Sequence, residues 1–318
     1  MNRIGLLLAL AGLGGAMLLL AQQDLTEVGA LLASAGLGLV LAGAAHALPM
    51  ALNAEAWRVL LPGSKRPSLA AMTANVWIRE SINGLLPVAR IGGEVASYRL
   101  LRAEGVGPAP AAASLMVDMA IGILSQLAFA LLGLALLAGH GGAVGWQGIV
   151  LGMLGGLALA GGFILAQRAN LLSRLAGALN AVAAGRFHAF TAHSQKIDRM
   201  ARRLWRSRGA IGLCFGWQFA GWVAGALEIW LALYFLGHPV EPATALAIEA
   251  MIQALSSAAF LVPGALGLQE AGFLGLGLLV GLPAEAGAAL AIARRIRDLV
   301  VFLPGLAAWV WAEKRIGR

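Results

Sequence analysis

Several ionisable side chains lie within stretches of this sequence that are otherwise apolar, and these residues could do chemistry. Six of them are Glu94, Asp118, Glu249, Glu270, Arg294 and Arg297. A charge in hydrocarbon costs at least about 2.5 kcal/mol unless it is paired, so such charges are functional candidates. One hypothesis is that Arg294 and Arg297 hold an anionic headgroup while the glutamates gate it or exchange protons. The other is that these arginines pair with Glu249, Glu270 or Asp298 and hold the structure together; both can be true.

Other polar residues in similar settings are assigned to packing or to the membrane interface. We expect Arg295 to face a different side of its helix from Arg294. Glu55 and Glu228 are expected to serve helix packing or the interface, and Trp57 to belong to the interfacial belt of aromatic residues.

The composition determines which class of protein must position these charges. Of the 318 residues, 60% are hydrophobic and 12% are charged, and the mean hydropathy is +0.82. Globular domains carry roughly 25% charged residues, so this chain is too apolar to cover a water-facing surface. Runs at 4–21, 28–51 and 209–237 are long enough to cross a hydrocarbon layer of about 30 Å as helices. The sequence therefore predicts an all-α, polytopic membrane protein.

The placement of basic residues predicts the orientation in the membrane. Residues 168–208 contain one acid and nine basic residues, namely Arg168, Arg174, Arg186, Lys196, Arg199, Arg202, Arg203, Arg206 and Arg208. The loops near 24–27, 140–146 and 238–242 contain no lysine or arginine. The positive-inside rule then places 168–208 and both termini in the cytoplasm of a bacterium, with the chain in its inner membrane. A basic segment against anionic lipid headgroups accounts for the net charge of +8 without a nucleic-acid partner.

Six spanning helices and two re-entrant helical hairpins fit this orientation. The spans are expected at about 4–21, 28–57, 109–138, 147–167, 209–237 and 285–311, and the hairpins at about 68–106 and 241–283. A signal peptide is the alternative for the first run, but it lacks a clear cleavage site, so we expect a retained helix. Each hairpin segment is too polar and too interrupted by proline and glycine to span once.

An internal repeat relates the two hairpins. Pro263 follows Pro87 by 176 positions, and Glu270 follows Glu94 by the same offset. Three spans in each half make this an inverted repeat, with repeat 1 at about 1–138 and repeat 2 at about 147–318 within one membrane domain. Inverted repeats with broken helices are typical of alternating-access carriers, whose sites lie near the bilayer midplane. The substrate-binding residues predicted on this basis are Arg90, Gly92, Gly93, Glu94, Asp118, Glu249, Pro263, Gly264, Gly267, Glu270, Arg294 and Arg297.

Signals of soluble enzymes are missing from the sequence. It has no phosphate-binding loop, no Ser–His–Asp or Cys–His arrangement, and its five histidines lack metal-ligand spacing. We therefore predict no catalytic residue, no cofactor and no metal. Two alternatives to a carrier stay open: an integral-membrane lipid-modifying enzyme, and a scaffold for lipid-synthesis enzymes.

The motifs LLPVARIGGE, VPGALGLQEAG and RRIRD resemble those of the lysylphosphatidylglycerol synthase transmembrane (flippase-like) family. The residues that match its pattern are Pro87, Gly92, Gly93, Glu94, Pro263, Gly264, Gly267, Glu270, Arg294 and Arg297. Within that family, WIRESINGLLPVARIGGEVASYRLL resembles the hopanoid-biosynthesis-associated branch called HpnL. Gln269 departs from the pattern, because relatives often carry a basic residue there.

The resemblance implies movement of a lipid between leaflets, with a hopanoid, a hopanoid-linked lipid or an anionic phospholipid as cargo. The synthases of the superfamily carry a soluble catalytic domain after the membrane part. The sequence ends at Arg318, so we expect no aminoacyl transfer. Membrane lipids are the expected partners, together with anionic headgroups at 168–208 and lipid-biosynthesis enzymes.

Overall fold

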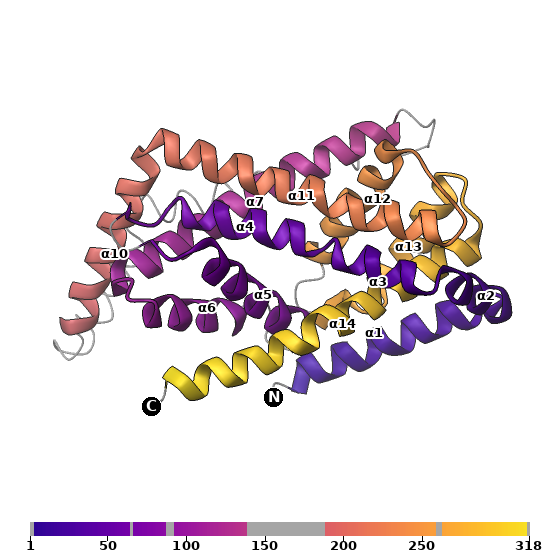
Figure 1. The fold of residues 1–318 in the computed structure, drawn as a ribbon, viewed down its shortest axis with the longest axis horizontal. Coiled ribbons are helices and arrows are strands. Elements are labelled where there is room, and N and C mark those ends of the chain that lie inside the picture. Colours follow the sequence, from indigo (N-terminus) through magenta and orange to yellow (C-terminus); the bar gives the residue numbers. More distant parts are fainter. Residues whose placement is uncertain (1–2, 64–65, 87–91, 139–187, 259–262, 317–318) are drawn as a thin grey trace.

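The computed structural model describes residues 3–63, 66–86, 92–138, 188–258 and 263–316, and the regular structure in these ranges is helical (Figure 1). The elements are α1 (Arg3–Ala21), α2 (Leu25–Ala35), α3 (Leu37–Ala44), α4 (Ala47–Arg58), α5 (Leu69–Leu85), α6 (Gly92–Ala103), α7 (Pro108–Ala138), α10 (His188–Arg206), α11 (Arg208–Phe235), α12 (Pro242–Ala258), the 3-10 turn η2 (Pro263–Ala265), α13 (Leu268–Leu279) and α14 (Ala284–Ile316).

Three stretches of helix in the described ranges are long and apolar enough to cross a membrane. They are Leu37–Arg58, Pro108–Ala138 and Arg208–Phe235. The helix α14 is longer, at 33 residues, but carries the charged run of the last predicted span. Together with the overall composition, these helices identify a multi-pass membrane protein.

The predicted spans differ in how closely the helices follow them. The runs 4–21, 109–138, 209–237 and 285–311 each fall largely within one helix: α1, α7, α11 and α14. The run 28–57 is divided at Gly36, whose φ of 47° ends α2. A shorter interruption at 45–46 separates α3 from α4, which together form the apolar stretch Leu37–Arg58. The span predicted at 147–167 lies outside the described residues.

Both segments predicted as hairpins are pairs of helices with a break between them. The helices α5 and α6 pack together at one end of the long axis, and α12 and α13 pack together toward the other (Figure 1). The turn η2 of the second break contacts α5, the helix that leads into the first break. A Cβ atom built on Gly264 would lie 3.4 Å from the carbonyl oxygen of Gly84, so the two backbones approach closely there.

Apolar packing holds these helices against the long ones. One cluster of buried residues joins α2, α3, α11, α12, α13 and α14, and a second joins α4 to α5, α6 and α7. Trp57 belongs to the second cluster: it is fully buried, and its Nε1 donates to Ser114 Oγ at 3.1 Å. The prediction that Trp57 lies in the interfacial belt was therefore wrong, because α7 covers the end of α4.

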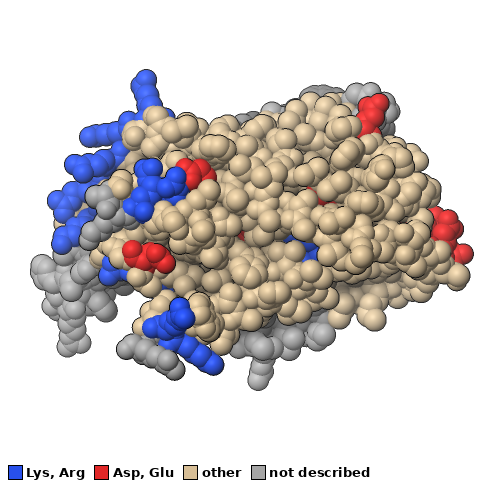
Figure 2. Space-filling view, in the orientation of Figure 1, with Lys and Arg blue, Asp and Glu red and all other residues tan. Residues whose placement is uncertain are grey.

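Exposed charges are segregated along the molecule. Lysine and arginine gather at the end formed by α10, whereas the opposite end shows acidic side chains on the same face (Figure 2). The helix α10 buries Ala201 against α7 and exposes Lys196, Arg199, Arg203 and Arg206. Most of the surface between the two ends is uncharged in this view, as a surface in contact with lipid would be.

Candidate functional site

The second break carries Glu270 at the first turn of α13. Gly264, Ala265 and Gly267 have φ values of 58°, 47° and 82°, so the chain turns sharply before the helix begins. The backbone N–H of Gly267 donates to Glu270 Oε2 at 2.7 Å. A carboxylate in this position satisfies a free N–H group of the helix end and interacts favourably with the positive end of the helix dipole.

Arg295 on α14 also forms hydrogen bonds with this break. Its Nε donates to Glu270 Oε1 at 2.6 Å, and its Nη1 donates to the carbonyl oxygen of Gly264 at 2.8 Å. The same Nη1 lies 3.3 Å from Asp298 Oδ2. One guanidinium group thus joins the turn, the start of α13 and α14.

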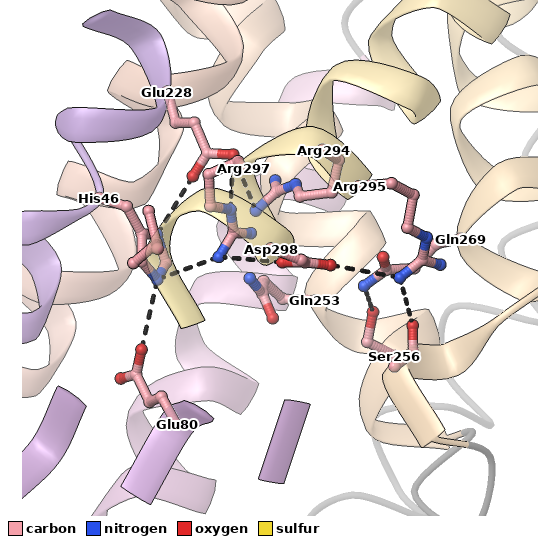
Figure 3. Close-up of polar contacts among 12 residues, drawn as sticks. His46, Glu80, Glu228, Gln253, Ser256, Gln269, Arg294, Arg295, Arg297 and Asp298 are labelled. Carbon is pink, nitrogen blue, oxygen red and sulfur yellow. Dashed lines mark hydrogen bonds and ion pairs between the residues drawn. The ribbon is translucent and has the colours of Figure 1, made fainter. Parts of the chain in front are cut away.

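Gln269 holds the start of α13 against α12. Its Nε2 donates to Ser256 Oγ at 2.7 Å (Figure 3). This amide occupies the position at which a basic residue was expected from the resemblance, and a hydroxyl group is a suitable partner for it.

The first break carries Glu94 in the corresponding position of α6. The backbone N–H of Gly93 donates to Asn83 Oδ1 at 2.9 Å, and Asn83 Nδ2 donates to Glu94 Oε1 at 3.5 Å. A Cβ atom built on Gly93 would lie 2.5 Å from the carbonyl oxygen of Arg79, so the two helices of this pair meet at a distance that only glycine allows.

Arg79 joins this break to α7. Its Nη1 lies 3.8 Å from Glu94 Oε2 and 3.1 Å from Asp118 Oδ2. Gln218 on α11 completes the surroundings of Asp118, because its Nε2 donates to Asp118 Oδ1 at 2.8 Å. We call Arg79, Glu94, Asp118 and Gln218 the first-break cluster.

Between the two breaks lies a larger group of charges centred on α14, which we call the central network. Its members are His46, Glu80, Glu228, Glu249, Arg294, Arg297 and Asp298 (Figure 3, which does not label Glu249).

The arginines of the central network are paired with carboxylates. Arg294 Nη2 donates to Glu249 Oε2, and Arg294 Nη1 lies 3.4 Å from Glu228 Oε1. Arg297 Nε donates to the same Glu228 oxygen at 3.1 Å, and Arg297 Nη1 lies 3.3 Å from Asp298 Oδ1. Because Arg294 and Arg297 are three positions apart, they share a face of α14, and Glu228 on α11 lies between their guanidinium groups.

His46, at the joint between α3 and α4, extends the network toward α5. Its Nδ1 lies 3.1 Å from Glu228 Oε2, and its Nε2 lies 3.3 Å from Glu80 Oε2. Arg297 Nη1 is 3.2 Å from the same Nε2 (Figure 3). The imidazole therefore connects α11, α5 and α14 at one point.

An apolar groove of about 470 Å³ runs beside this network. Its lining comes from α3, α4, α5 and α14: Gly43, Ala44, Ala47, Met50, Thr73, Ala74, Trp77, Val300 and Val301. Its walls lie within a turn of His46, Glu80 and Arg297 along their helices, because Ala47, Trp77 and Val300 are one to three positions from these residues. Volumes of this size are typical of small-molecule sites.

The structure brings most of the predicted site residues near one another, but in two groups. Glu94 and Asp118 share the first-break cluster, together with Gly93, which lies at the start of α6 beside Gly92. Glu249, Arg294 and Arg297 belong to the central network, and Glu270 is joined to it through Arg295 and Asp298. Pro263, Gly264 and Gly267 form the turn before Glu270. Arg90 and Pro87 lie outside the described residues.

Sequence reasoning missed three ionisable members of these groups: His46, Arg79 and Glu80. The cost of an unpaired charge in hydrocarbon applies to all three, so the same argument could have included them. Arg295 was expected to face a different side of α14 from Arg294, and it does, because it contacts Glu270. Glu228 was assigned to packing or the interface, whereas it is buried and contacts His46, Arg294 and Arg297. Nothing in its local sequence distinguishes it from a packing residue, since its partners come from other helices.

The described residues contain no group of three or more histidine, cysteine or acidic side chains arranged to hold a metal ion. Every arginine of the central network has a carboxylate partner instead. The arrangement can therefore hold the helix breaks in place, exchange protons among its carboxylates and imidazole, and accept hydrogen bonds from a polar group that enters beside the groove.

Comparisons with known proteins give the family of the chain. A family model described as the lysylphosphatidylglycerol synthase TM region matches residues 4–305. The searches of curated proteins and of solved structures find no match. The match covers nearly all of the chain and agrees with the multi-pass helical structure and with a role in lipid handling. The chain belongs to the family of lysylphosphatidylglycerol synthase TM regions.

Proposed function

We propose that this protein moves a lipid between the two leaflets of the membrane, as a flippase or carrier. The observation that carries the proposal is the meeting of the apolar groove with the buried central network. A lipid has an apolar chain and a polar headgroup, and these two surfaces lie side by side here.

The groove suits an acyl or other hydrocarbon chain of the cargo. Its lining is apolar apart from the Thr73 hydroxyl and the Trp77 indole, and Trp77 Nε1 already donates to the carbonyl oxygen of Val301 at 2.7 Å. A few charged atoms are visible between the uncharged ones near the middle of the molecule (Figure 2). A headgroup could therefore reach polar groups without crossing the whole bundle.

For the cargo, we propose a hopanoid or hopanoid-linked lipid, following the resemblance to the HpnL branch, with an anionic phospholipid as the second candidate. The pairing of Arg294 and Arg297 favours a headgroup without net negative charge. An anionic headgroup would have to displace Glu228 or Glu249 from these arginines, and breaking a buried ion pair costs about 3–5 kcal/mol.

The proposed arrangement in the membrane is six spans and two re-entrant hairpins related as inverted repeats. The hairpins would enter from opposite sides, since α5 starts toward one end of the molecule and α12 at the other (Figure 1), and these are the basic and the acidic end (Figure 2). We place the basic end and both termini in the cytoplasm, with the chain in a bacterial inner membrane.

The helix α10 is proposed to lie against anionic lipid headgroups. It borders a cavity of about 520 Å³ that is lined by Arg202, Trp205 and Arg206 of α10 and by Arg208 at the start of α11. Each basic residue near an anionic surface contributes roughly 1 kcal/mol of attraction.

The transport proposal is tested by following a labelled lipid in vesicles that contain the purified protein. A membrane-impermeant quencher reports how much label remains in the outer leaflet, and each candidate cargo is assayed in turn. Two variants probe the site: Ala47→Phe fills the groove, and Glu270→Gln removes the charge at the second break. Ala30→Phe, at an exposed position of α2, is the control for adding a bulky side chain.

We expect wild type and Ala30→Phe to move the label, and both site variants to move it at least about tenfold more slowly. Movement that survives in Ala47→Phe and Glu270→Gln contradicts the site. A modified lipid in the same vesicles, detected by mass spectrometry, would favour the enzyme. Unchanged leaflet distribution and unchanged chemistry for every cargo would favour the scaffold.

A further inference from the structure

One ring nitrogen of His46 has two partners that require opposite protonation states. Glu80 Oε2 lies 3.3 Å from His46 Nε2, and Arg297 Nη1 lies 3.2 Å from it. The carboxylate needs a proton on Nε2, whereas the guanidinium group can donate to Nε2 only if that nitrogen has a free lone pair. Both contacts cannot be satisfied at once.

The other ring nitrogen, Nδ1, keeps its proton whether or not Nε2 is protonated. Nδ1 lies 3.1 Å from Glu228 Oε2, an acceptor, so Nδ1 carries a proton throughout. The neutral imidazole then donates from Nδ1 to Glu228 and accepts from Arg297 through Nε2. The imidazolium ion donates to Glu228 and Glu80 together, and it repels Arg297.

Arg297 has alternative partners when the imidazole is protonated. Its Nη1 lies 3.3 Å from Asp298 Oδ1, and its Nε donates to Glu228 at 3.1 Å. Losing the contact with His46 therefore leaves the guanidinium group with two carboxylates. The hydrogen bond that the structure gives Glu80 is the one to His46, so the contact of Glu80 with the start of α4 depends on the proton.

The charges around His46 favour uptake of a positive charge. The groups that face the ring are Glu228 from α11, Glu80 from α5 and Arg297 from α14, and one step further lie Arg294, Asp298 and Glu249. With Arg295 and its partner Glu270 counted as well, five carboxylates accompany three guanidinium groups. An added proton on His46 brings this group closer to neutrality, which lowers the cost of holding it in a low-dielectric interior.

Glu80 and His46 lie nearer the surface of the bundle than Glu228 does. The Glu80 side chain is 26% exposed and that of His46 is 12% exposed, whereas Glu228 is 6% exposed. Glu80 is thus the most exposed member of the network, and it contacts His46 directly.

From these contacts we propose that His46 Nε2, with Glu80, is a proton-binding site that couples proton movement to lipid movement. The proton enters from water by way of Glu80, rests on Nε2, and leaves to water when the site opens on the other side of the membrane. With the proton bound, α5 is drawn toward the joint of α3 and α4; without it, α14 takes that contact through Arg297. These elements also line the groove, so the coupling rests on the proposed lipid transport, whereas the proton site itself does not.

The first test measures the proton on His46 directly. The full chain is prepared with ¹⁵N-labelled histidine after the other histidines, His140, His188, His193 and His238, are replaced by glutamine. We expect the ¹⁵N signals of His46 to change, as pH rises from about 4 to about 9, from an imidazolium ion to a neutral ring protonated on Nδ1. A single charge state over this whole range would overturn the proposal.

Glu80→Gln tests the partner in the same experiment. The variant keeps the size of the side chain but loses the negative charge, so the His46 transition should move to lower pH by at least about one unit, that is, about tenfold weaker proton binding. An unchanged transition would show that Glu80 does not hold the proton, which would overturn this assignment.

The second test measures coupling in vesicles that contain a pH-sensitive dye and the labelled lipid. We expect a pH gradient to change the rate of lipid movement several-fold, with the dye reporting proton movement across the membrane. His46→Gln should lose both effects, whereas the control His238→Gln, in the loop before α12, should keep them. Lipid movement without gradient dependence would overturn the coupling and leave the proposed function intact. Failure of all lipid movement would instead contradict the proposed function, and the ¹⁵N experiment would still decide the proton site.

Discussion

At the scale of single residues, Arg294, Arg295 and Arg297 contact different partners because they point in different directions around α14. Arg294 and Arg297 are three positions apart and face Glu228, whereas Arg295 is turned by about 100° and meets Glu270 at the second break. Each guanidinium group has carboxylate partners, which is the condition for keeping a charge inside an apolar protein at tolerable cost.

The pair of Arg79 and Asp118 should be strongly coupled, because both side chains are largely buried. We expect Arg79→Gln and Asp118→Asn each to destabilise the protein by about 3 kcal/mol. Arg79→Gln leaves the buried Asp118 without its arginine, and Asp118→Asn leaves Arg79 with only the more distant carboxylate of Glu94. The double variant should lose less than the sum of the two, by at least about 1 kcal/mol. Unfolding of the four proteins in mixed micelles measures this coupling.

The pair of Arg58 and Glu55 is the control for that measurement. It has a similar contact, 2.5 Å from Nε to Oε2, but both side chains are more exposed, at the end of α4. Its coupling energy should be only a few tenths of a kcal/mol. Equal coupling in the two pairs would show that burial does not set their strength.

Gly93 should be intolerant of even one added carbon. The Cβ of Gly93→Ala would meet the Arg79 carbonyl and the Asn83 side chain, so we expect a loss of about 1–3 kcal/mol from forced separation of α5 and α6. Gly216→Ala, on an open face of α11, should be neutral or stabilise by up to about 1 kcal/mol. Thermal unfolding in detergent compares the two, and equal stability of both variants would contradict the close contact.

At the scale of elements, the two breaks place polar groups inside the bundle in similar ways. In each, a glycine precedes the glutamate near the start of a helix, and an arginine from another element contacts that glutamate. The arginine comes from α5 in one case and from α14 in the other. The two breaks thus have similar local structure, but the arginine that contacts the glutamate comes from a different helix in each.

The helix α10 should respond to anionic lipid, because its exposed face carries Lys196 and several arginines. A fluorescent label on Arg203→Cys, in a Cys214→Ala background, should be quenched more by labelled headgroups as the anionic fraction of the vesicle rises. High salt should reverse the effect, since it screens exposed charges. A label on Glu27→Cys, at the start of α2, should show no such dependence; equal behaviour of the two labels would count against the proposed contact.

At the scale of the whole molecule, the segregated charges predict a single orientation (Figure 2). In intact bacterial cells, a membrane-impermeant thiol reagent should react with Glu27→Cys and Glu241→Cys and should not react with Arg203→Cys until the membrane is opened. Cys214 is buried and serves as the internal negative control. Reaction at position 203 in intact cells would invert the proposed topology.

The predictions made from the sequence agree with the structure for some features and differ from it for others. The interruptions predicted near Gly92 and Gly264 are present as the start of α6 and as η2, because glycine and proline act through local backbone conformation. The predicted span 28–57 is instead divided at Gly36, a glycine that the apolar composition around it concealed. The inverted repeat and the list of binding residues stay predictions.

The sequence by itself determined the membrane class of the protein, the helical nature of its segments, the positions of both breaks and which side chains cannot stay charged without a partner. These properties depend on composition and on neighbours along the chain. Only the tertiary structure decided which charges meet. His46 and Arg297 are 251 positions apart, and Arg294 and Glu249 are 45 apart. Their contacts depend on how each helix is rotated and packed against the others. The buried residues of many helices set that packing together, and no single stretch of sequence contains it.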